Sequence, residues 1–193
     1  GFNEKACLAC YGMAECSLAI SFAPLFEGPS TDCVDGDHHS DHQEALPIHL
    51  SENPGRARCF VDCGMPLPEY EVEVRDEDGT VLPDRRSGSI FVRGASVMSG
   101  YFNAPDETAA CLSEDGWLNT GDVGYRVDGS LIITGRKKDL IIINGRNIWP
   151  QDLEYLAEHQ PEVRIGDALA FSVPMPDDAE LCVLVVQCLE SDP

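Results

Sequence analysis

The segment YGMAE, residues 11–15, holds residue types that can bind a nucleotide. Tyr11 followed by Gly12 presents an aromatic ring and bare backbone together, which can face a flat ligand such as a purine. Glu15 offers the hard carboxylate oxygens that Mg²⁺ prefers beside phosphates. An ordinary turn at the end of a strand explains the same residues without a ligand, because glycine is common in turns.

The segment GWLNTGDVGYRVDGSLIITGRKKD, residues 116–139, carries a second group of candidates. Asp122 follows a glycine turn, and a carboxylate there can accept hydrogen bonds from both hydroxyls of a ribose. Arg136 lies fourteen residues further on, and its guanidinium could reach ribose or phosphate oxygens. Lys138 stands between a β-rich stretch and an α+β stretch, which suits an exposed hinge. Taken singly, Asp122 is more simply explained as a capping residue in a loop, and Arg136 as a surface charge at the end of a strand.

Alternating apolar and polar residues predict the strands that must position these groups. Residues 70–75 (YEVEVR) and 88–94 (GSIFVRG) are expected as strands. Asp128–Gly129 between two alternating runs predicts a β-hairpin, which could bring the chain from Asp122 back towards Arg136. Proline and acids at the start of residues 105–112 predict a short helix.

The two ends of the chain give different patterns. Residues 6–11 (ACLACY) predict a short buried strand, with a helical start near Glu15. Residues 27–56, rich in Gly, Pro, Ser, Asp and His, predict a long loop or an inserted element.

After the hairpin, residues 138–145 predict a strand, and Gly145 between two asparagines predicts a turn. Pro150 then stands at the first position of a helix with an apolar stripe, and DALAFSVP and LCVLVVQCL predict two more strands. Residues 1–135 are therefore expected to be mainly β, and residues 138–193 to be α+β.

Composition excludes several classes of protein. The 193 residues carry a formal net charge of −21, which argues against non-specific binding to nucleic acid or anionic lipid. No run approaches eighteen consecutive apolar residues, so we expect no membrane span, and the first residues do not resemble a signal peptide. The nine cysteines are odd in number and irregularly spaced, which favours reduced, mostly buried thiols in a cytoplasmic protein.

Two segments resemble metal sites. VDGDHHSDH, residues 34–42, groups three histidines with three aspartates, and Cys7 and Cys10 form a CxxC pair. The CxxC pair lacks a second pair at zinc-finger spacing. For residues 34–42 we favour a solvated acidic loop, because metal ligands need neighbouring groups that fix them.

In their order along the chain, YGMAE, GYF at 100–102, GWLNTGD and GRKKDLIIINGRNIWPQDLE resemble the adenylate-forming enzymes. This superfamily includes acyl-CoA synthetases, peptide-synthetase adenylation domains and luciferase. The chain looks most like the fatty acyl-AMP ligases and their fatty acyl-CoA synthetase relatives. Ala14 stands where the wider superfamily has threonine, and GRNIWPQDLE is similar to the pattern of this subgroup. The segment between Glu15 and Cys63 is also where those ligases carry an extra insertion.

The resemblance implies an α+β fold in two parts. Residues 1–137 would form the β-rich C-terminal part of a large adenylation domain, with an inserted loop at about 27–56. Residues 138–193 would form part of a small α+β lid domain, with Lys138 as the hinge on which catalysis depends.

The resemblance also implies a role for each candidate ligand. Tyr11, Gly12 and Met13 would line the adenine pocket of ATP or AMP. Asp122 would hold the ribose hydroxyls and Arg136 would help to hold the same ribose. Glu15 would coordinate Mg²⁺.

The implied activity is ATP-dependent activation of a fatty acid as acyl-AMP, with release of pyrophosphate. The acyl group would pass to the phosphopantetheine of an acyl carrier protein or, alternatively, to CoA; the insertion favours the carrier protein. The family's phosphate-binding loop and its late catalytic lysine have no counterpart in the sequence, so we expect residues 1–193 alone not to make acyl-adenylate. A non-catalytic nucleotide-binding or scaffold module is the alternative from another class.

Overall fold

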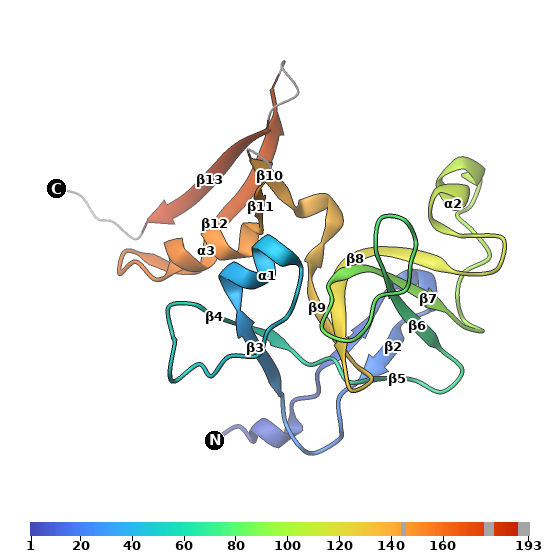
Figure 1. The fold of residues 1–193 in the computed structure, drawn as a ribbon, viewed down its shortest axis with the longest axis horizontal. Coiled ribbons are helices and arrows are strands. Elements are labelled where there is room, and N and C mark those ends of the chain that lie inside the picture. Colours follow the sequence, from blue (N-terminus) through green and yellow to red (C-terminus); the bar gives the residue numbers. More distant parts are fainter. Residues whose placement is uncertain (144–145, 176–179, 189–193) are drawn as a thin grey trace. The chain divides into compact units, whose positions relative to one another are not determined.

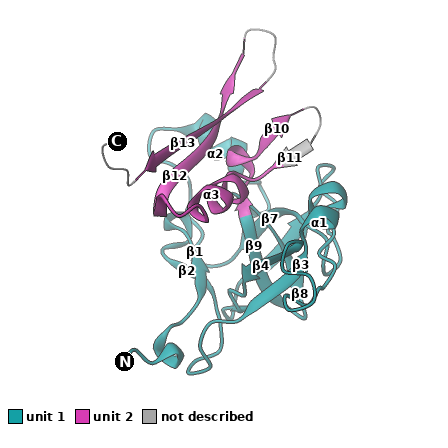
Figure 2. Ribbon diagram, turned by 90° about the vertical axis from the view of Figure 1, so that its left-hand side faces the viewer, with its two compact units in different colours: residues 1–134 teal, residues 135–193 magenta. Residues whose placement is uncertain are grey.

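The computed structural model describes residues 1–143, 146–175 and 180–188. It divides into two compact units, residues 1–134 and 135–193 (Figure 2). The predicted domain boundary between residues 137 and 138 lies three positions after this division. Strands outnumber helices in the described residues, and the expected α+β class is confirmed.

The first unit is built around a four-stranded antiparallel sheet in the order β6-β7-β8-β9 (Figure 1). Its strands are β6 (Glu71–Arg75), β7 (Gly88–Arg93), β8 (Leu118–Val127) and β9 (Ser130–Arg136), and β9 continues past the division between the units. The predicted hairpin is confirmed: Asp128 and Gly129 join β8 to β9 with φ of 50° and 89°. Both angles are left-handed, as the tight hairpin turn favoured by Asp-Gly requires.

A three-stranded sheet packs its apolar residues into the same core. It consists of β1 (Cys10–Gly12), β2 (Ala19–Phe22) and β5 (Met65–Pro66). Two short 3₁₀ helices, Glu4–Ala6 and Ala14–Cys16, flank β1, so the helical start near Glu15 is confirmed. The strand predicted over residues 6–11 is largely wrong: it begins at Cys10, and residues 6–8 are exposed.

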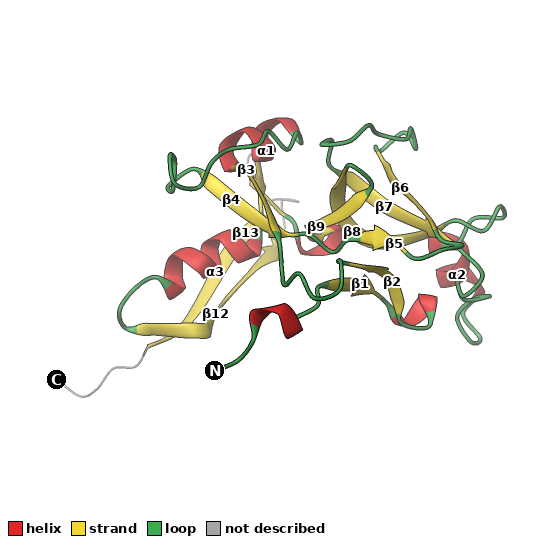
Figure 3. Ribbon diagram, turned by 90° about the horizontal axis from the view of Figure 1, so that it is seen from below, coloured by secondary structure: helices red, strands yellow, loops and turns green. Residues whose placement is uncertain are grey.

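Residues 27–56, predicted as a long loop or an inserted element, contain regular structure. Strand β3 (Thr31–Asp35) leads directly into helix α1 (Gly36–His42), and β3 pairs with β4 (Ala57–Val61) in an antiparallel ribbon (Figure 3). The carboxylate of Asp35 starts the helix by accepting a hydrogen bond from the His38 backbone N–H at 3.2 Å. Residues 34–42 are therefore a strand end and a helix, and the predicted solvated loop is wrong.

The ribbon packs on the four-stranded sheet through a small core of its own. Val34 and Ala45 are completely buried against Tyr125 of β8 and Ile132 of β9. His39 of α1 is also completely buried, and its ring lies 5.5 Å from that of Phe60 and 6.0 Å from that of Tyr125. This buried histidine explains why a polar sequence, DHHSDH, forms a packed helix.

The cysteines differ from the expectation of reduced, mostly buried thiols. Cys33 and Cys59 form a disulfide across the ribbon, and the other seven cysteines are free. Among the free thiols, Cys16 and Cys63 are buried, whereas three are exposed: Cys7, Cys10 and Cys188. The disulfide was not predictable from spacing, because it depends on the pairing of β3 with β4.

Helix α2 (Pro105–Cys111) confirms the predicted helix. It starts on proline with Asp106 and Glu107 in its first turn, where acids favour the helix dipole. Thr108 ties it to the preceding loop, because its hydroxyl accepts a hydrogen bond from the Tyr101 N–H at 2.9 Å.

The second unit combines helix α3 (Pro150–Glu158) with two pairs of antiparallel strands. One pairs β10 (Ile141–Ile143) with β11 (Arg146–Ile148), and the other pairs β12 (Val163–Pro174) with β13 (Glu180–Cys188). The strand predicted over residues 138–145 begins only at Ile141, because a 3₁₀ turn covers Lys137–Asp139. The predicted turn at Gly145 lies outside the described residues.

Helix α3 begins at Pro150 as predicted, and it packs on β12. The Glu154 carboxylate accepts a hydrogen bond from the Ala170 N–H at 3.0 Å. Trp149 is buried, and its ring covers Gly135, where any side chain would collide with it. In the part of the chain that is described, no helix has the length and apolarity that crossing a bilayer would require.

Candidate functional site

Strands β1 and β8 bring Tyr11 and Asp122 together across 111 positions of sequence. The Tyr11 hydroxyl donates a hydrogen bond to the Asp122 carboxylate at 2.6 Å, and the two residues are 8% and 7% exposed. Burial raises the pKa of Tyr11, and the hydrogen bond to Asp122 raises it further, so the phenol stays a donor at neutral pH. Two residues predicted separately from the sequence thus form one buried pair.

The Asp122 backbone is fixed as well as its side chain. Gly121 before it has a φ of 77°, and the Asp122 N–H donates a hydrogen bond to the Thr120 hydroxyl at 3.1 Å. A carboxylate accepts hydrogen bonds at both of its oxygens. The geometry therefore presents a fixed acceptor group at the TGD turn.

Gly12 and Met13 follow Tyr11 on the way to the 3₁₀ helix. Gly12 is exposed, and a Cβ at this position would overlap the backbone carbonyl of Leu18, the residue before β2. Close approach of two backbones therefore requires glycine here, whether or not a ligand binds. Met13 is half-buried and packs against the core cluster that contains Tyr11.

Glu15 is held by a residue from the GYF motif. The Tyr101 hydroxyl donates a hydrogen bond to the Glu15 carboxylate at 2.8 Å, and this bond, together with burial and the Glu15 charge, raises the pKa of Tyr101 to about 12. The Glu15 carbonyl accepts a second bond from the Met98 N–H at 2.7 Å. Tyr101 also lines a surface hollow of about 680 Å³ with Phe102, Thr108 and Leu112 among its walls.

A cation at Glu15 would have one carboxylate ligand from this surface. No group of three or more His, Cys, Asp or Glu side chains able to hold a metal occurs within residues 1–143, 146–175 and 180–188. A single hard carboxylate fits Mg²⁺, which keeps several waters and binds through one or two carboxylates plus substrate phosphates. It does not fit a structural metal enclosed by protein ligands.

Residues 34–42 contain the histidines and aspartates that resembled a metal site. The His39 Nε2 is bonded to the Ser87 hydroxyl at 2.7 Å, and the His38 Nε2 to the Glu44 carboxylate at 3.1 Å. Burial lowers the pKa of His39 to about 4, with a further contribution from the charge of Arg58. His39 is thus a neutral core residue.

Arg136 and Lys138 belong to the second unit, and Asp122 belongs to the first. Arg136 is the exposed last residue of β9, and Lys138 is exposed in the 3₁₀ turn that follows. Lys138 borders a cavity of about 420 Å³ together with Glu154 and Phe171. The roles of Arg136 at the ribose and of Lys138 as the hinge remain predictions.

Two contacts of this site were missed from the sequence. GYF was recognised as a motif, but no role followed for Tyr101, and the hydroxyl of Tyr11 was not paired with Asp122. The sequence signal was limited to the presence of both tyrosines in family motifs, YGMAE and GYF. Their carboxylate partners lie in other motifs. Pairing across 111 and 86 positions depends on the fold, which the residue types do not reveal.

Comparison with known proteins gives consistent matches. The family described as "AMP-binding enzyme" matches residues 2–102. A protein of Caulobacter vibrioides, whose name assigns it provisionally to the acyl-CoA synthetases, is 50% identical over 96% of this chain and 32% of its own. A long-chain-fatty-acid–AMP ligase of Mycolicibacterium smegmatis is 36% identical over 92% of this chain and 31% of its own.

A solved structure from a study of fatty acyl-adenylate ligases from E. coli and L. pneumophila matches with a TM-score of 0.83 and 44% identity. The match covers 99% of this chain and 34% of that one. The chain thus spans about a third of the length of the curated relatives described above. Because the family match covers more than half of its residues, the chain belongs to the AMP-binding enzyme family.

Proposed function

We propose that the chain is the nucleotide-side portion of an ATP-dependent fatty acid ligase. The parent enzyme activates a carboxylate as acyl-AMP with release of pyrophosphate. The observation that carries the proposal is the buried contact between Tyr11 and Asp122, because it fixes the motif carboxylate beside the motif aromatic residue. The names of the relatives and the family match support the same reaction class.

In this reaction the residues of the chain bind and orient. Asp122 accepts hydrogen bonds from the ribose hydroxyls, and the neutral Tyr11 hydroxyl holds that carboxylate in place. The ring and backbone of Tyr11, Gly12 and Met13 form one side of the adenine pocket. Holding both reactants removes much of the entropic cost of bringing them together.

Glu15 is the residue of this chain that would hold Mg²⁺, with Tyr101 orienting its carboxylate. When bound, the metal would neutralise negative charge on the phosphates while the carboxylate of the fatty acid attacks the α-phosphate. Arg136 adds positive charge near the ribose, and Lys138 is the pivot of the lid.

The acyl acceptor that we propose is the phosphopantetheine thiol of an acyl carrier protein, in the cytoplasm. The folded ribbon of β3, α1 and β4 lies in the part of the chain where fatty acyl-AMP ligases carry an insertion. A thioester assay on the full-length parent would compare holo-carrier protein with CoA. Turnover with CoA at a comparable rate would remove the preference for the carrier.

Calorimetry with AMP on the full-length parent tests the nucleotide site. Asp122→Asn keeps an acceptor for Tyr11 but removes the charge, so we expect at least a tenfold loss of AMP affinity, about 1.4 kcal/mol. Asp128→Asn, an exposed change in the turn that follows β8, is the matched control and should bind AMP normally. Unchanged binding by the Asp122 variant would exclude this ribose site.

Pyrophosphate exchange on the same proteins separates the enzyme from a non-catalytic module. An enzyme with the proposed activity gives fatty-acid-dependent exchange that falls with the Asp122 variant. AMP binding without exchange in the wild-type parent would instead favour a nucleotide-binding scaffold.

A further inference from the structure

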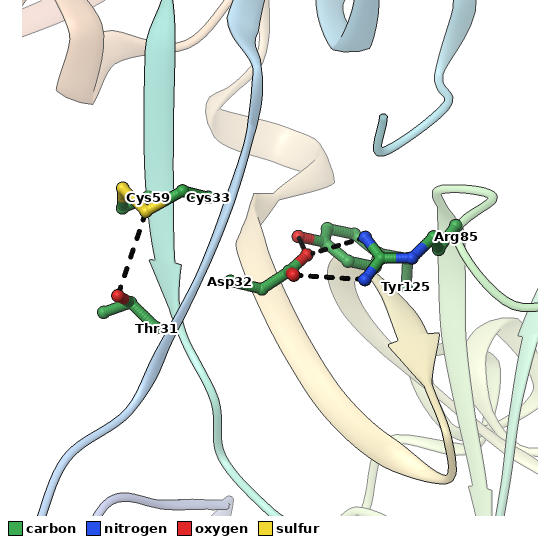
Figure 4. Close-up of a disulfide and its surroundings, with 6 residues drawn as sticks. All are labelled: Thr31, Asp32, Cys33, Cys59, Arg85 and Tyr125. Carbon is green, nitrogen blue, oxygen red and sulfur yellow. Dashed lines mark hydrogen bonds and ion pairs between the residues drawn. A yellow bond between two sulfur atoms is a disulfide. The ribbon is translucent and has the colours of Figure 1, made fainter. Parts of the chain in front are cut away.

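The disulfide of Cys33 and Cys59 closes the ribbon on itself. The two cysteines are directly opposite each other in the register of β3 and β4, and 26 positions separate them in the sequence (Figure 4). The other seven cysteines are free thiols. One disulfide in a chain of free thiols is unlike a secreted scaffold, in which pairing is the rule.

The disulfide is open to reagents from one side. Cys59 is exposed and Cys33 is half-buried, and the Thr31 hydroxyl lies 3.9 Å from the Cys33 sulfur. Thiol–disulfide exchange requires that an attacking thiolate reach one sulfur, and access is one of the factors that set its rate. Cys59, the more exposed of the two residues, is therefore the one that we expect a thiolate to attack.

Hydrogen bonds hold the closed segment in several places, including Gly36 N–H to the Arg56 carbonyl at 2.8 Å and Ile48 N–H to the Cys33 carbonyl at 2.9 Å. Helix α1 has its own contacts with β3, and its buried anchor is His39, which is bonded to Ser87. Between α1 and β4, residues 49–56 are exposed. The disulfide adds a covalent bond to the antiparallel pairing of β3 with β4 and so limits how far this segment can move away from the sheet.

Strand β3 is also held by hydrogen bonds from residues outside the ribbon. Asp32, beside Cys33, receives two hydrogen bonds from the Arg85 guanidinium at 3.1 and 3.2 Å and one from the Tyr125 hydroxyl at 2.7 Å (Figure 4). These bonds do not depend on the disulfide. Breaking the disulfide therefore leaves β3 attached to the sheet while it releases the covalent closure of the segment.

We propose that Cys33–Cys59 is a reversible redox modification site, reduced by dithiols, and that reduction loosens residues 36–58. This proposal is independent of the proposed enzymatic function. The ribbon would be closed under oxidising conditions and loosened under reducing conditions.

The exchange proceeds in two balanced steps. A thiolate of the dithiol attacks the Cys59 sulfur, a mixed disulfide forms, and the Cys33 sulfur leaves with the electron pair of the broken bond. The second thiolate of the reductant then attacks the reductant sulfur that is bonded to Cys59. This closes a ring in the reductant and expels Cys59 as a thiolate. The protein gains two electrons and takes two protons from water, and the dithiol is oxidised to a cyclic disulfide.

The test combines mass-spectrometric alkylation with hydrogen exchange on the full chain, first without reductant and then with dithiothreitol. In the oxidised protein we expect Cys33 and Cys59 to resist alkylation, whereas exposed thiols such as Cys7 react. Dithiothreitol should make both alkylatable and speed amide exchange in α1 at least tenfold. Oxidised dithiothreitol, added after the reductant is removed, should restore the slow exchange.

Variants separate the disulfide from a general effect of reductant. The double variant Cys33→Ser with Cys59→Ser should exchange fast with or without dithiothreitol, and Cys33→Val with Cys59→Val repeats the test if serine prevents folding. The control, Cys7→Ser with Cys188→Ser, removes two exposed free thiols and should respond like the wild type. Free Cys33 and Cys59 thiols in the air-oxidised protein, or exchange in α1 that ignores reduction, would overturn the proposal.

Discussion

The four-stranded sheet and the ribbon of β3, α1 and β4 are stabilised in different ways. The sheet follows from local pattern: alternating residues form β6 and β7, and Asp128–Gly129 makes the turn between β8 and β9. The ribbon depends on contacts between residues far apart, since Asp32 binds Arg85 and His39 binds Ser87. A local pattern can be recognised in a sequence. Contacts between residues 53 and 48 positions apart cannot.

The largest effect is expected in the sheet, at Gly124 of β8. A Cβ there would overlap the carbonyl oxygen of Ile132 on β9, so Gly124→Ala should lower the free energy of unfolding by about 3 kcal/mol. Gly55, beside the ribbon, has nothing within 4 Å of a built Cβ, so Gly55→Ala is the matched control, within about 0.5 kcal/mol. Urea denaturation followed by circular dichroism measures both; equal losses would contradict the packing of β8 on β9.

The ribbon should be the acid-sensitive region because of His39. Its folded-state pKa, about 4, lies below the ordinary value of 6.5, so the unfolded chain binds the proton more readily. The stability due to the neutral ring is complete above pH 6.5 and is lost as pH falls towards 4, by about 3 kcal/mol at most.

Comparing unfolding free energies at pH 7 and pH 4.5 isolates this contribution. His39→Gln should lose less stability on acidification than the wild type, because glutamine does not titrate. His49→Gln changes an exposed histidine and should keep the wild-type pH dependence. Identical acid sensitivity in all three proteins would show that His39 does not make the ribbon acid-labile.

A smaller loss is expected when the anchor of the ribbon is cut at Asp32. Asp32→Ala leaves Arg85 and Tyr125 without their shared acceptor and should cost about 2 kcal/mol. Asp37→Ala removes a carboxylate whose side chain is 79% exposed, and its ion pair with Arg56 at 3.6 Å should contribute little. Thermal melts of the two variants decide this point, and equal melting temperatures would argue against the anchor.

The smallest effect is expected at the turn of the sheet. Asp128→Asn should change the unfolding free energy by less than about 0.5 kcal/mol, because aspartate and asparagine both tolerate the φ of 50° at position 128. Asp128→Val should cost about 1 kcal/mol or more, because β-branched residues are strained at positive φ. If valine were tolerated, local turn chemistry would not be what fixes the hairpin, and the sheet would depend on long-range contacts as the ribbon does.

The same contrast explains how much the sequence could predict. The strands β6 to β9, helix α2 and the start of α3 follow from alternation, turns and capping, and the order of the motifs identified the family. Helix α1 was missed although Asp35 is a good helix start, because a polar run with one buried histidine has no apolar stripe. The Cys33–Cys59 bond and the Tyr11–Asp122 contact depend on register and strand packing, which residue types alone do not specify.

The Cys33–Cys59 disulfide also determines whether a proteolytic cut between these two residues separates the chain into two fragments. Arg56 lies inside the closed segment with a side chain that is 57% exposed, so a trypsin-like enzyme can cut after it. The pieces 1–56 and 57–193 would stay joined through the sulfur bridge and would migrate as one band in a denaturing gel without reductant. A nicked protein would therefore pass as intact until mercaptoethanol is added, and paired gels are the way to detect such damage.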